Sequence, residues 1–352
     1  MQKKVLYISS NWATFVQKDL DLIARWYLTD YAAHDWRQKK TVPLLFIKQF
    51  FWLLFRLPKA QAVMVMFAGF WSIWPVVLAP FFKVPVYVIV GGTEVMSYPQ
   101  ISYGTLRKPL WAKLVRFTFK RATRLLPVHE KLAFHQDAFF DNSKQGFKHH
   151  FPDLTTPYTV IHNGFPVEQY PPPPMDNRQA QSFITVAFVP NQMNFAVKGV
   201  KLILNTAPLM PEAKFTIVGM SEDFKNSLSS IPKNVRILGP RSQAEFQTEL
   251  YQHRFYLQLS ISEGFPNALC EAMLSGCVPI VSEVTSLPEI IGDTGAVVPL
   301  NQAETAAEVF RAMASRSSND LNLLAQKARK KVMNDYPLEK RAQAFYKLLK
   351  RS

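Results

Sequence analysis

The chain has 352 residues and a formal net charge of +15, and 48% of its residues are hydrophobic. This composition is too apolar for a disordered protein, and the length suffices for two domains that each bury a core. Cys270 and Cys277 are the only cysteines, which excludes a disulfide scaffold, and their spacing matches no zinc site. We therefore expect a globular protein of a reducing compartment.

The N-terminal half alternates short apolar runs with segments of helical length. The first run, Val5–Ile8, is too short for a secretory signal and is interpreted as a buried strand. Continuous apolar strands that alternate with helices are typical of parallel sheets covered on both faces. The strands predicted in this half are Lys4–Ile8, Ala62–Phe67, Val86–Val90, Arg124–Pro127 and Thr159–Ile161.

An uncharged stretch runs from Ala60 to Phe82, and its length alone would allow a transmembrane helix. Gly69, Pro75 and Pro80 interrupt it at the spacing of an α/β domain. We therefore favour a buried strand, a turn and a short apolar helix over a membrane span. A span stays open as the alternative.

Two basic segments follow the same pattern of aromatic and cationic residues. Residues 44–56 are rich in aromatics and carry two cations, and residues 110–124 form a basic amphipathic helix. Residues 1–168 hold 21 Lys and Arg against 10 Asp and Glu, so the N-terminal half carries most of the positive charge. Such segments can lie on an anionic membrane surface. A buried helix with a solvated basic face is the other interpretation, and no nucleic-acid reader motif is present.

A run of four prolines, residues 171–174, separates the two halves and cannot continue a helix or a central strand. We predict an N-terminal domain over 1–168, a linker over 169–182, a C-terminal domain over 183–334 and a final helix over 335–352. The C-terminal strands are predicted at Ile184–Val189, Lys214–Val218, Val235–Leu238, Phe255–Leu259 and Val278–Val281. The fold class is therefore α/β, with two doubly wound parallel-sheet domains.

The most informative segment spans residues 260–281. A strand ends near Leu259, a turn of small residues carries Glu263, and a helix begins around Pro266. Gly276 closes this helix in the left-handed conformation. The free N–H groups of Asn267, Ala268 and Leu269 then form a seat for a phosphate at the edge of the sheet.

Two carboxylates, Glu263 and Glu271, flank this predicted phosphate seat. Carboxylates repel an anion, but they accept hydrogen bonds from sugar and ribose hydroxyls, as an acidic residue does in dinucleotide folds. For Glu271 alone, a solvated helix face is an alternative explanation. The neighbouring Glu-Gly-Phe-Pro sequence favours a site.

The spacing of Glu263 and Glu271 resembles the Glu-x7-Glu motif of the retaining glycosyltransferases of family 4, which have the GT-B fold of two Rossmann-like domains facing a cleft. Further segments resemble the family in order along the chain, and the similarity is sharp over residues 159–298. These segments are Val160–Val167, Lys198–Val200, Lys214–Gly219, Val235–Gly239 and Pro288–Gly295. The resemblance also implies a C-terminal helix that returns to the N-terminal domain.

The resemblance implies a role for each matching residue. Glu263 and Lys198 are the implied catalytic residues: Glu263 contacts the transferred sugar, and Lys198 neutralises the donor diphosphate. Glu271 binds the ribose hydroxyls. The remaining implied donor-binding residues are Gly264, Phe265, Pro266, Asn267, Ala268, Gly219, Arg241 and Asn191. A lysine and a helix N-terminus stabilise a departing diphosphate, so no metal and no further cofactor is expected.

The sequence departs from the family at two points. The usual second diphosphate arginine is absent, and Asn191, Asn194 or Arg241 is expected to substitute. Gly91 stands where many relatives have the histidine that touches the donor sugar. Residues expected near the acceptor or the cleft are Gly92, Thr93, Glu94, His129 and Asn163. A helix cap is the alternative for His129.

We therefore expect a retaining glycosyltransferase that moves a sugar from a UDP- or GDP-sugar to a saccharide or lipid-linked glycan in cell-surface polysaccharide synthesis. It is expected to be cytoplasmic and peripheral on the inner face of the membrane, with an anionic membrane surface and no nucleic acid as partner. Two alternatives remain. One is a sugar-nucleotide epimerase of the same fold, and the other is a non-catalytic GT-B scaffold that binds a partner glycosyltransferase.

Overall fold

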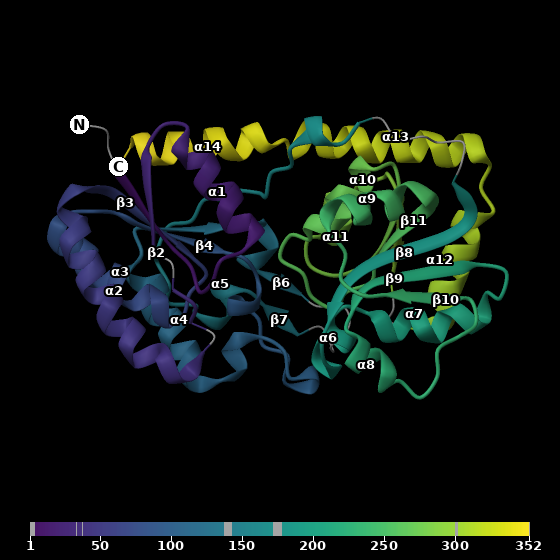
Figure 1. The fold of residues 1–352 in the computed structure, drawn as a ribbon, viewed down its shortest axis with the longest axis horizontal. Coiled ribbons are helices and arrows are strands. Elements are labelled where there is room, and N and C mark those ends of the chain that lie inside the picture. The colour runs from purple at the N-terminus through teal and green to yellow at the C-terminus, as the bar shows by residue number, and fades with distance from the viewer. Residues whose placement is uncertain are drawn as a thin grey trace. The chain divides into compact units, whose positions relative to one another are not determined.

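A computed structural model describes residues 4–32, 34–36, 38–136, 143–171, 178–299 and 302–351. The packing of the chain divides it into two compact units. Unit 1 comprises residues 1–135, 145–162 and 339–352, and unit 2 comprises residues 136–144 and 163–338. Each unit contains a parallel sheet with helices on both of its faces (Figure 1). The predicted α/β class is confirmed.

The sheet of unit 1 has the strand order β2-β1-β3-β4-β5. These strands are β1 (Lys4–Ile8), β2 (Leu28–Ala32), β3 (Ala60–Met66), β4 (Val86–Val90) and β5 (Arg124–Pro127). In this order the connections reverse direction between β1 and β3, which is the switch point of a doubly wound sheet. The principal helices are α1 (Thr14–Ala24), α2 (Val42–Arg56), α3 (Ile73–Leu78), α4 (Pro109–Arg121), α5 (Phe147–His150) and α14 (Leu338–Lys350).

The uncharged stretch 60–82 folds as strand β3, the short helix α3 and flanking 3-10 turns. One turn, η3 (Phe70–Ser72), precedes α3, and another, η4 (Ala79–Phe82), follows it. Within the described residues, no helix has both the length and the apolar character needed to cross a membrane. The interpretation of this stretch as strand, turn and short helix is confirmed.

The strand predicted at Thr159–Ile161 is wrong. This segment lies beside β5, and the Thr159 and Ile161 N–H groups donate to Leu125 O and Pro127 O at 2.9 and 3.0 Å. Only an isolated bridge between Leu125 and Tyr158 forms. Because Pro127 has no N–H to return a bond, the ladder cannot repeat.

The last helix, α14, belongs to unit 1 and is held there by a buried ion pair. Arg341 Nε and Nη2 donate to the two carboxylate oxygens of Asp19 at 2.7 and 2.9 Å, and both side chains are buried. Arg341 also donates to Ile161 O and His162 O. Tyr7 donates to Asp19 at 3.0 Å, so this carboxylate joins β1, α1 and α14.

The sheet of unit 2 has the strand order β10-β9-β8-β11-β12-β13. These strands are β8 (Gln179–Val189), β9 (Lys214–Met220), β10 (Val235–Leu238), β11 (His253–Gln258), β12 (Val278–Ser282) and β13 (Ala296–Val298). The connections reverse between β8 and β11. The helices are α6 (Gln192–Val197), α7 (Val200–Thr206), α8 (Glu222–Asn226), α9 (Gln243–Gln252), α10 (Asn267–Leu274), α11 (Leu287–Ile291), α12 (Ala303–Ala314) and α13 (Ser318–Asp335).

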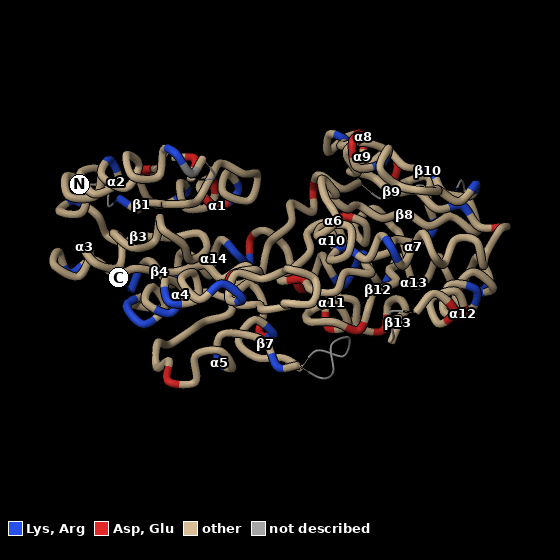
Figure 2. Tube along the Cα trace, turned by 90° about the horizontal axis from the view of Figure 1, so that it is seen from below, with Lys and Arg blue, Asp and Glu red and all other residues tan. Residues whose placement is uncertain are grey.

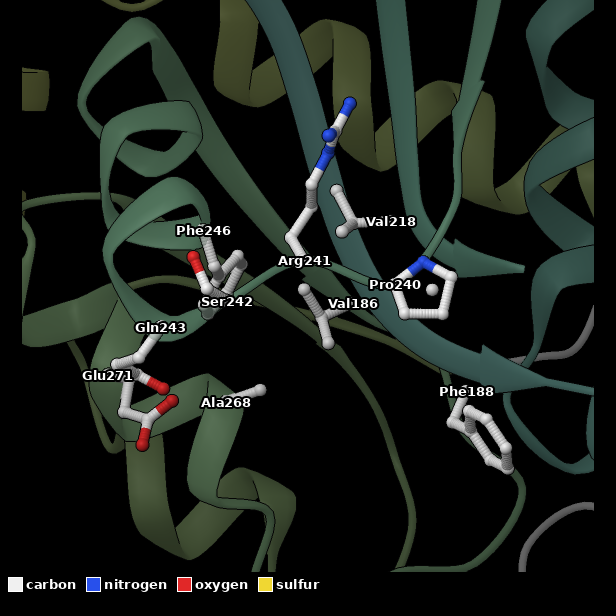
Figure 3. A pocket seen from close by; sticks show the side chains of 11 residues that line it. Val186, Phe188, Val218, Pro240, Arg241, Ser242, Gln243, Phe246, Ala268 and Glu271 are labelled. Atoms are coloured by element: carbon white, nitrogen blue, oxygen red, sulfur yellow. The ribbon is translucent and has the colours of Figure 1, made fainter. Parts of the chain in front are cut away.

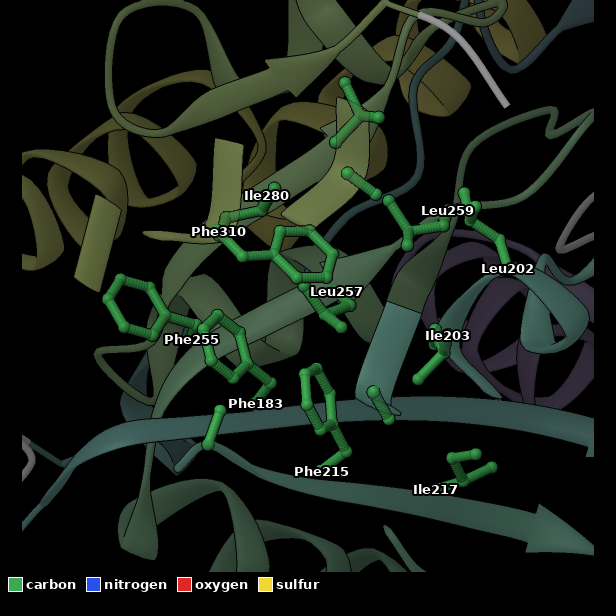
Figure 4. Packing of buried hydrophobic residues seen from close by; sticks show 14 of the residues in the cluster. Phe183, Leu202, Ile203, Phe215, Ile217, Phe255, Leu257, Leu259, Ile280 and Phe310 are labelled. Atoms are coloured by element: carbon green, nitrogen blue, oxygen red, sulfur yellow. The ribbon is translucent and has the colours of Figure 1, made fainter. Parts of the chain in front are cut away.

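The core of unit 2 is built around the ring of Phe183 on β8. Its ring centroid lies 5.0 Å from Phe215, 4.9 Å from Phe255 and 5.2 Å from Phe310 (Figure 4). These rings join three neighbouring strands to α12, and stacked aromatic pairs add to the stability that burial of their area provides. The strands of this sheet are thereby held rigidly, which fixes the loops at their carboxyl ends.

One strand boundary and two whole strands differ from the sequence-based expectation. Strand β8 begins at Gln179, inside the stretch predicted as linker. Prolines 172–174 of that stretch lie outside the described residues. Strands β2 and β13 were not predicted: β2 is largely exposed at the edge of its sheet, and β13 is only three residues long. Neither carries the apolar run that marked the other strands.

Candidate functional site

The carboxyl ends of β8 and β11 lie side by side at the switch point of the unit 2 sheet, where open α/β sheets bind ligands. After β8 the chain enters α6, which ends at Lys198. After β11 it enters the loop that carries Glu263 and leads to α10. The two predicted catalytic residues are thereby brought together from distant parts of the sequence.

Glu263 is held by three donors that all reach the same carboxylate oxygen. Lys198 Nζ lies 2.7 Å from Glu263 Oε1, Ser260 Oγ lies 2.7 Å from it, and Gln258 Nε2 lies 3.1 Å from it. The Glu263 N–H donates to Thr285 Oγ1 at 3.3 Å. The Glu263 side chain is 10% exposed and that of Lys198 is 29% exposed. The carboxylate is therefore fixed in orientation before any ligand binds.

A chain of buried polar groups extends behind Glu263. Tyr256 OH donates to Gln258 Oε1 at 3.0 Å, and Gln258 Nε2 also donates to Ser260 Oγ at 2.9 Å. Tyr256, Gln258 and Ser260 are all buried. Sequence reasoning missed these residues, although an amide and a hydroxyl group inside an otherwise apolar strand are a signal of a polar network.

Close backbone packing positions Lys198. The next residue, Gly199, has φ +66°, and a Cβ atom at this position would lie 1.9 Å from Leu259 O. The Ile261 N–H donates to Val197 O at 2.8 Å, which ties the loop after β11 to α6. Only glycine permits this approach, so the Lys-Gly dipeptide sets the lysine beside Glu263.

A pocket of about 240 Å³ lies at the carboxyl edge of the same sheet. Four of the predicted donor-binding residues line it, namely Gly219, Arg241, Ala268 and Glu271. In Figure 3 the carboxylate of Glu271 and the side chain of Gln243 lie on one side, and Phe188 lies at the opposite end. Pro240, which the resemblance places beside the base together with Arg241, also lines it. The lining residues that sequence reasoning missed as part of a site are Val186, Phe188, Val218, Ser242, Gln243 and Phe246.

Two features shape the wall of this pocket. Gly219 has φ +103°, and a Cβ atom there would lie 2.7 Å from Ala187 O, so glycine is required. Phe188 is 63% exposed although it lies in a central strand. An exposed ring between the buried residues Ala187 and Val189 marks this side chain as part of a site, and its exposure is visible only in the folded structure.

Glu271 is buried on α10, and its charge affects neighbouring groups. Burial raises the pKa of the Tyr170 hydroxyl, and the negative charge of Glu271 raises that pKa further. Gln243 Nε2 donates to Tyr170 OH at 3.2 Å. Tyr170 therefore stays neutral and positions Gln243 beside the pocket.

The start of α10 is fixed by contacts within unit 2. Pro266 precedes the first helical residue, Asn267, and Gly276 ends the helix at φ +78° as predicted. Asn163 Nδ2 donates to Asn267 Oδ1 at 3.0 Å, so Asn163 supports the predicted phosphate seat. Gly264 stays partly exposed in the loop before the helix.

Phe265 packs into unit 2 rather than into the pocket. Its buried ring lies 4.9 Å from the ring of Tyr336 and 6.3 Å from that of Phe165. The side chain therefore anchors the loop, and the Phe265 carbonyl accepts from Asn163 Nδ2 at 3.4 Å.

The three candidate substitutes for the absent arginine, Asn191, Asn194 and Arg241, each have a partner within the protein. Asn191 Oδ1 accepts from the Asn194 N–H at 3.0 Å and caps α6. Arg241 is exposed and lies 3.4 Å from Glu245. Its guanidinium points away from Glu271 in Figure 3. Among the described residues, no group of three His, Cys, Asp or Glu side chains could hold a metal ion.

The glycine loop after β4 in unit 1 is organised by Glu94. Its carboxylate accepts from the Gly91 and Gly92 N–H groups at 2.8 and 3.0 Å. Glu94 is buried, and burial raises its pKa although these hydrogen bonds act in the opposite direction. Glu94 is therefore a loop anchor, whereas the neighbouring Thr93 is exposed and lies 3.0 Å from Tyr103 OH.

The space beside Gly91 is filled by Phe67. A Cβ atom on Gly91 would lie 2.0 Å from Phe67 Cε1, and Phe67 itself has φ +62°. A positive φ is costly for a bulky residue. The aromatic ring therefore occupies the place that the side chain of a histidine at position 91 would need.

His129 acts as a cap, which was the alternative to a site role. Its Nδ1 accepts from the Lys131 N–H at 3.2 Å at the start of the turn η8 (Glu130–Leu132). The ring is buried, and its centroid lies 5.5 Å from that of His162.

Comparison with known proteins gives matches of two kinds. Residues 184–315 match the family described as Glycosyl transferases group 1. GDP-mannose:cellobiosyl-diphosphopolyprenol alpha-mannosyltransferase of Xanthomonas oryzae is 27% identical over 121 residues. This match covers 32% of the chain and 32% of the relative, so only about a third of the curated relative is spanned.

Solved structures resemble the chain over almost all of its length. Sucrose-phosphate synthase from Thermosynechococcus elongatus superposes with a TM-score of 0.78 at 11% identity and 99% coverage of both chains. Anabaena HepE in complex with UDP and glucose gives 0.71 at 12% identity, covering 99% of this chain and 100% of HepE. At these identities the likeness concerns the fold, which is GT-B.

Proposed function

We propose that the protein is a retaining glycosyltransferase of family 4 that transfers a sugar from a nucleotide-diphosphate donor to a saccharide or lipid-linked acceptor. The observation that carries this proposal is the juxtaposition of Lys198 and Glu263 beside the pocket lined by Glu271. A cation, a fixed carboxylate and a second carboxylate thereby meet at one edge of one sheet. The match of residues 184–315 to group 1 glycosyl transferases supports the same reaction class.

The chemistry of sugar transfer explains the arrangement. Breaking the bond between sugar and phosphate places negative charge on the departing diphosphate. Lys198 and the N–H groups at the start of α10 offer positive potential to that charge, and no resident metal is needed for this role. Glu263 directs its second carboxylate oxygen, Oε2, to the transferred sugar, because the three donors described above occupy Oε1.

The nucleoside binds in the 240 Å³ pocket. Glu271 accepts hydrogen bonds from the ribose hydroxyls, and the base lies along Gly219 and Pro240. The exposed ring of Phe188 offers a surface on which the base can stack. The relatives supply two donor types to test, since GDP-mannose appears in one name and UDP in the other.

The acceptor is proposed to be a growing glycan of cell-surface polysaccharide synthesis at the cytoplasmic face of the membrane. The name of the Xanthomonas relative includes a diphosphopolyprenol-linked sugar as its acceptor. The net charge of +15 favours a peripheral position on an anionic membrane surface.

A thermal-shift screen against UDP-, GDP- and ADP-sugars tests the donor site. A ligand that binds only the native state at a hundred times its Kd raises the midpoint by roughly 5 °C in a protein of this size. We expect Glu271→Ala to lose this shift, and Glu304→Ala on the exposed face of α12 to keep it. If no nucleotide sugar moves the midpoint of the wild-type protein, the proposal fails.

A further inference from the structure

Helix α2 has two apolar faces, and only one of them is covered by the protein. The inner face is buried at Gln49 and Leu53, and the ring of Phe50 lies 4.9 Å from that of Trp74. The outer face carries large apolar side chains at helical spacing, which we call the α2 ridge. The ridge comprises Leu44 (54% exposed), Ile47 (56%), Phe51 (51%), Leu54 (36%) and Phe55 (74%).

The α2 ridge continues beyond the end of its helix. The turn η2 (Leu57–Lys59) follows α2 and packs against η4, where Phe81 is 81% exposed. Single exposed apolar residues are normal on protein surfaces, but a contiguous row of this size marks an interaction surface. We therefore expect a binding partner to cover the α2 ridge.

The charges around the ridge indicate what this occupant is. Between Gln38 and Arg124 the sequence contains thirteen Lys and Arg and a single acidic residue, Glu94. Glu94 is buried and bonded to backbone N–H groups, so this segment presents no carboxylate to solvent. Lys48 is exposed within the ridge, and further cations gather along α4 (Figure 2). The exposed cations of α4 are Lys113, Arg116, Lys120 and Arg121, of which Arg116 and Lys120 both pair with Asp153.

We propose that the α2 ridge and its surrounding cations dock the protein on an anionic lipid bilayer, with the ridge side chains inserted at the boundary between headgroups and acyl chains. An apolar helix face flanked by Lys and Arg is the pattern of interfacial helices. Cations within a Debye length of anionic headgroups add attraction that salt weakens. The insertion is shallow and does not span the membrane.

A second copy of the chain is the competing occupant, and charge argues against it. A symmetric dimer through this face would bring two net-basic surfaces together, and Asp153, an exposed carboxylate beside α4, is already paired with Arg116 and Lys120 of its own chain. A bilayer with anionic headgroups supplies both the apolar phase for the ridge and the negative charge for the cations. This inference deepens the proposed function, because it identifies the surface that meets the membrane.

Co-sedimentation with vesicles tests the surface directly. The probes are vesicles of pure phosphatidylcholine and of an equal mixture of phosphatidylcholine and phosphatidylglycerol. We expect the wild-type protein to bind the mixed vesicles and to be released by high salt. The triple variant Ile47→Ser, Phe51→Ser, Phe55→Ser is expected to bind at least about tenfold more weakly, because burial of even one such side chain is worth that factor.

Two matched variants separate the apolar and the charged contributions. Leu323→Ser removes a side chain on α13 that is 52% exposed, and it is expected to leave vesicle binding unchanged. Lys113→Gln with Arg121→Gln removes charge and is expected to weaken binding mainly at low salt. Equal binding of wild type and the ridge variant would overturn the proposal. The proposal would also be overturned if the wild-type protein is a dimer that does not bind vesicles and if the ridge variant is a monomer.

The donor site provides an independent readout. The ridge variant is expected to keep the thermal shift with nucleotide sugars, because its substitutions lie in unit 1, outside the pocket. Vesicle binding without any nucleotide-sugar shift would leave the membrane surface standing and refute the proposed function. A nucleotide-sugar shift without vesicle binding would leave the proposed function standing and refute the membrane surface.

Discussion

Lys198 and Glu263 lie 65 residues apart in the sequence and form an ion pair of 2.7 Å at the carboxyl edge of the unit 2 sheet. Before a donor binds, the lysine is therefore satisfied by a carboxylate rather than by water alone. A diphosphate brings more negative charge than one carboxylate, so it competes for the ammonium group. Gln258 and Ser260 continue to hold Glu263 when the lysine turns to the diphosphate.

Lys198→Ala removes the cation proposed for the leaving group. We expect kcat to fall by about 100-fold or more, the cost of losing one donor aimed at developing charge. Steady-state kinetics and calorimetric donor binding measure the effect. Lys201→Ala, on the exposed face of α7, is the matched control and should behave as wild type. Unchanged kcat in Lys198→Ala would contradict the assignment.

Gln258 is predicted to be a positioning residue that acts through Glu263. Gln258→Met keeps the volume of the side chain but removes the donor to Glu263 Oε1 and the acceptor for Tyr256 OH. We expect kcat to fall about tenfold while the KM for the donor stays within about twofold, as for a loss confined to the transition state. Tyr256→Phe, which removes one hydrogen bond of about 1 kcal/mol, should cost about fivefold in kcat. If the KM rises and kcat is retained, Gln258 shapes the donor pocket instead.

Gly91 and Phe67 are predicted to be coupled. Gly91→Ala places a Cβ atom 2.0 Å from the Phe67 ring, and we expect it to lower the free energy of unfolding by about 1–3 kcal/mol. Phe67→Ala removes the obstacle, so the double variant should recover most of the Gly91→Ala loss. Urea unfolding of the four proteins in a double-mutant cycle measures the coupling. Additive effects would show that the ring and the glycine do not compete for the same space.

His150 is predicted to make the folded state sensitive to acid. Burial, the largest cause, and the charges of His149 and His135 together lower its pKa from 6.5 to about 4. The unfolded chain therefore takes up the proton near pH 6.5, while the folded protein stays neutral at this site until about pH 4. Stability from this group is complete above pH 6.5 and is lost as the pH falls toward 4.

His150→Gln isolates this contribution. Because the His150 ring is partly exposed, solvent screening reduces the effect of its pKa shift on stability. We expect acid to lower the free energy of unfolding by about 1–2 kcal/mol less in the variant than in the wild type. Urea unfolding between pH 7 and about pH 4 measures the difference in slope against wild type. Parallel pH profiles of the two proteins would show that another group governs the acid response.

Local sequence patterns were sufficient to predict most of the frame. The apolar run at Val86–Val90 coincides with β4 because continuous apolar strands are distinctive in a doubly wound fold. Gly276 was predictable as the end of α10 because a positive φ favours glycine. The strand predicted at Thr159–Ile161 failed because Pro127, on the neighbouring strand, cannot donate a bond. No pattern within residues 159–161 reveals that.

The sequence by itself determined which residue types stand at the ends of which strands, and so predicted Glu263, Glu271 and Lys198 as a set. Only the tertiary structure decided that three donors share one oxygen of Glu263. The tertiary structure also decided that Phe67 fills the space beside Gly91 and that the outer face of α2 is uncovered. The physical reason is that periodicity and turn residues are local properties of the chain, whereas hydrogen-bond partners and exposure depend on segments that meet only after folding.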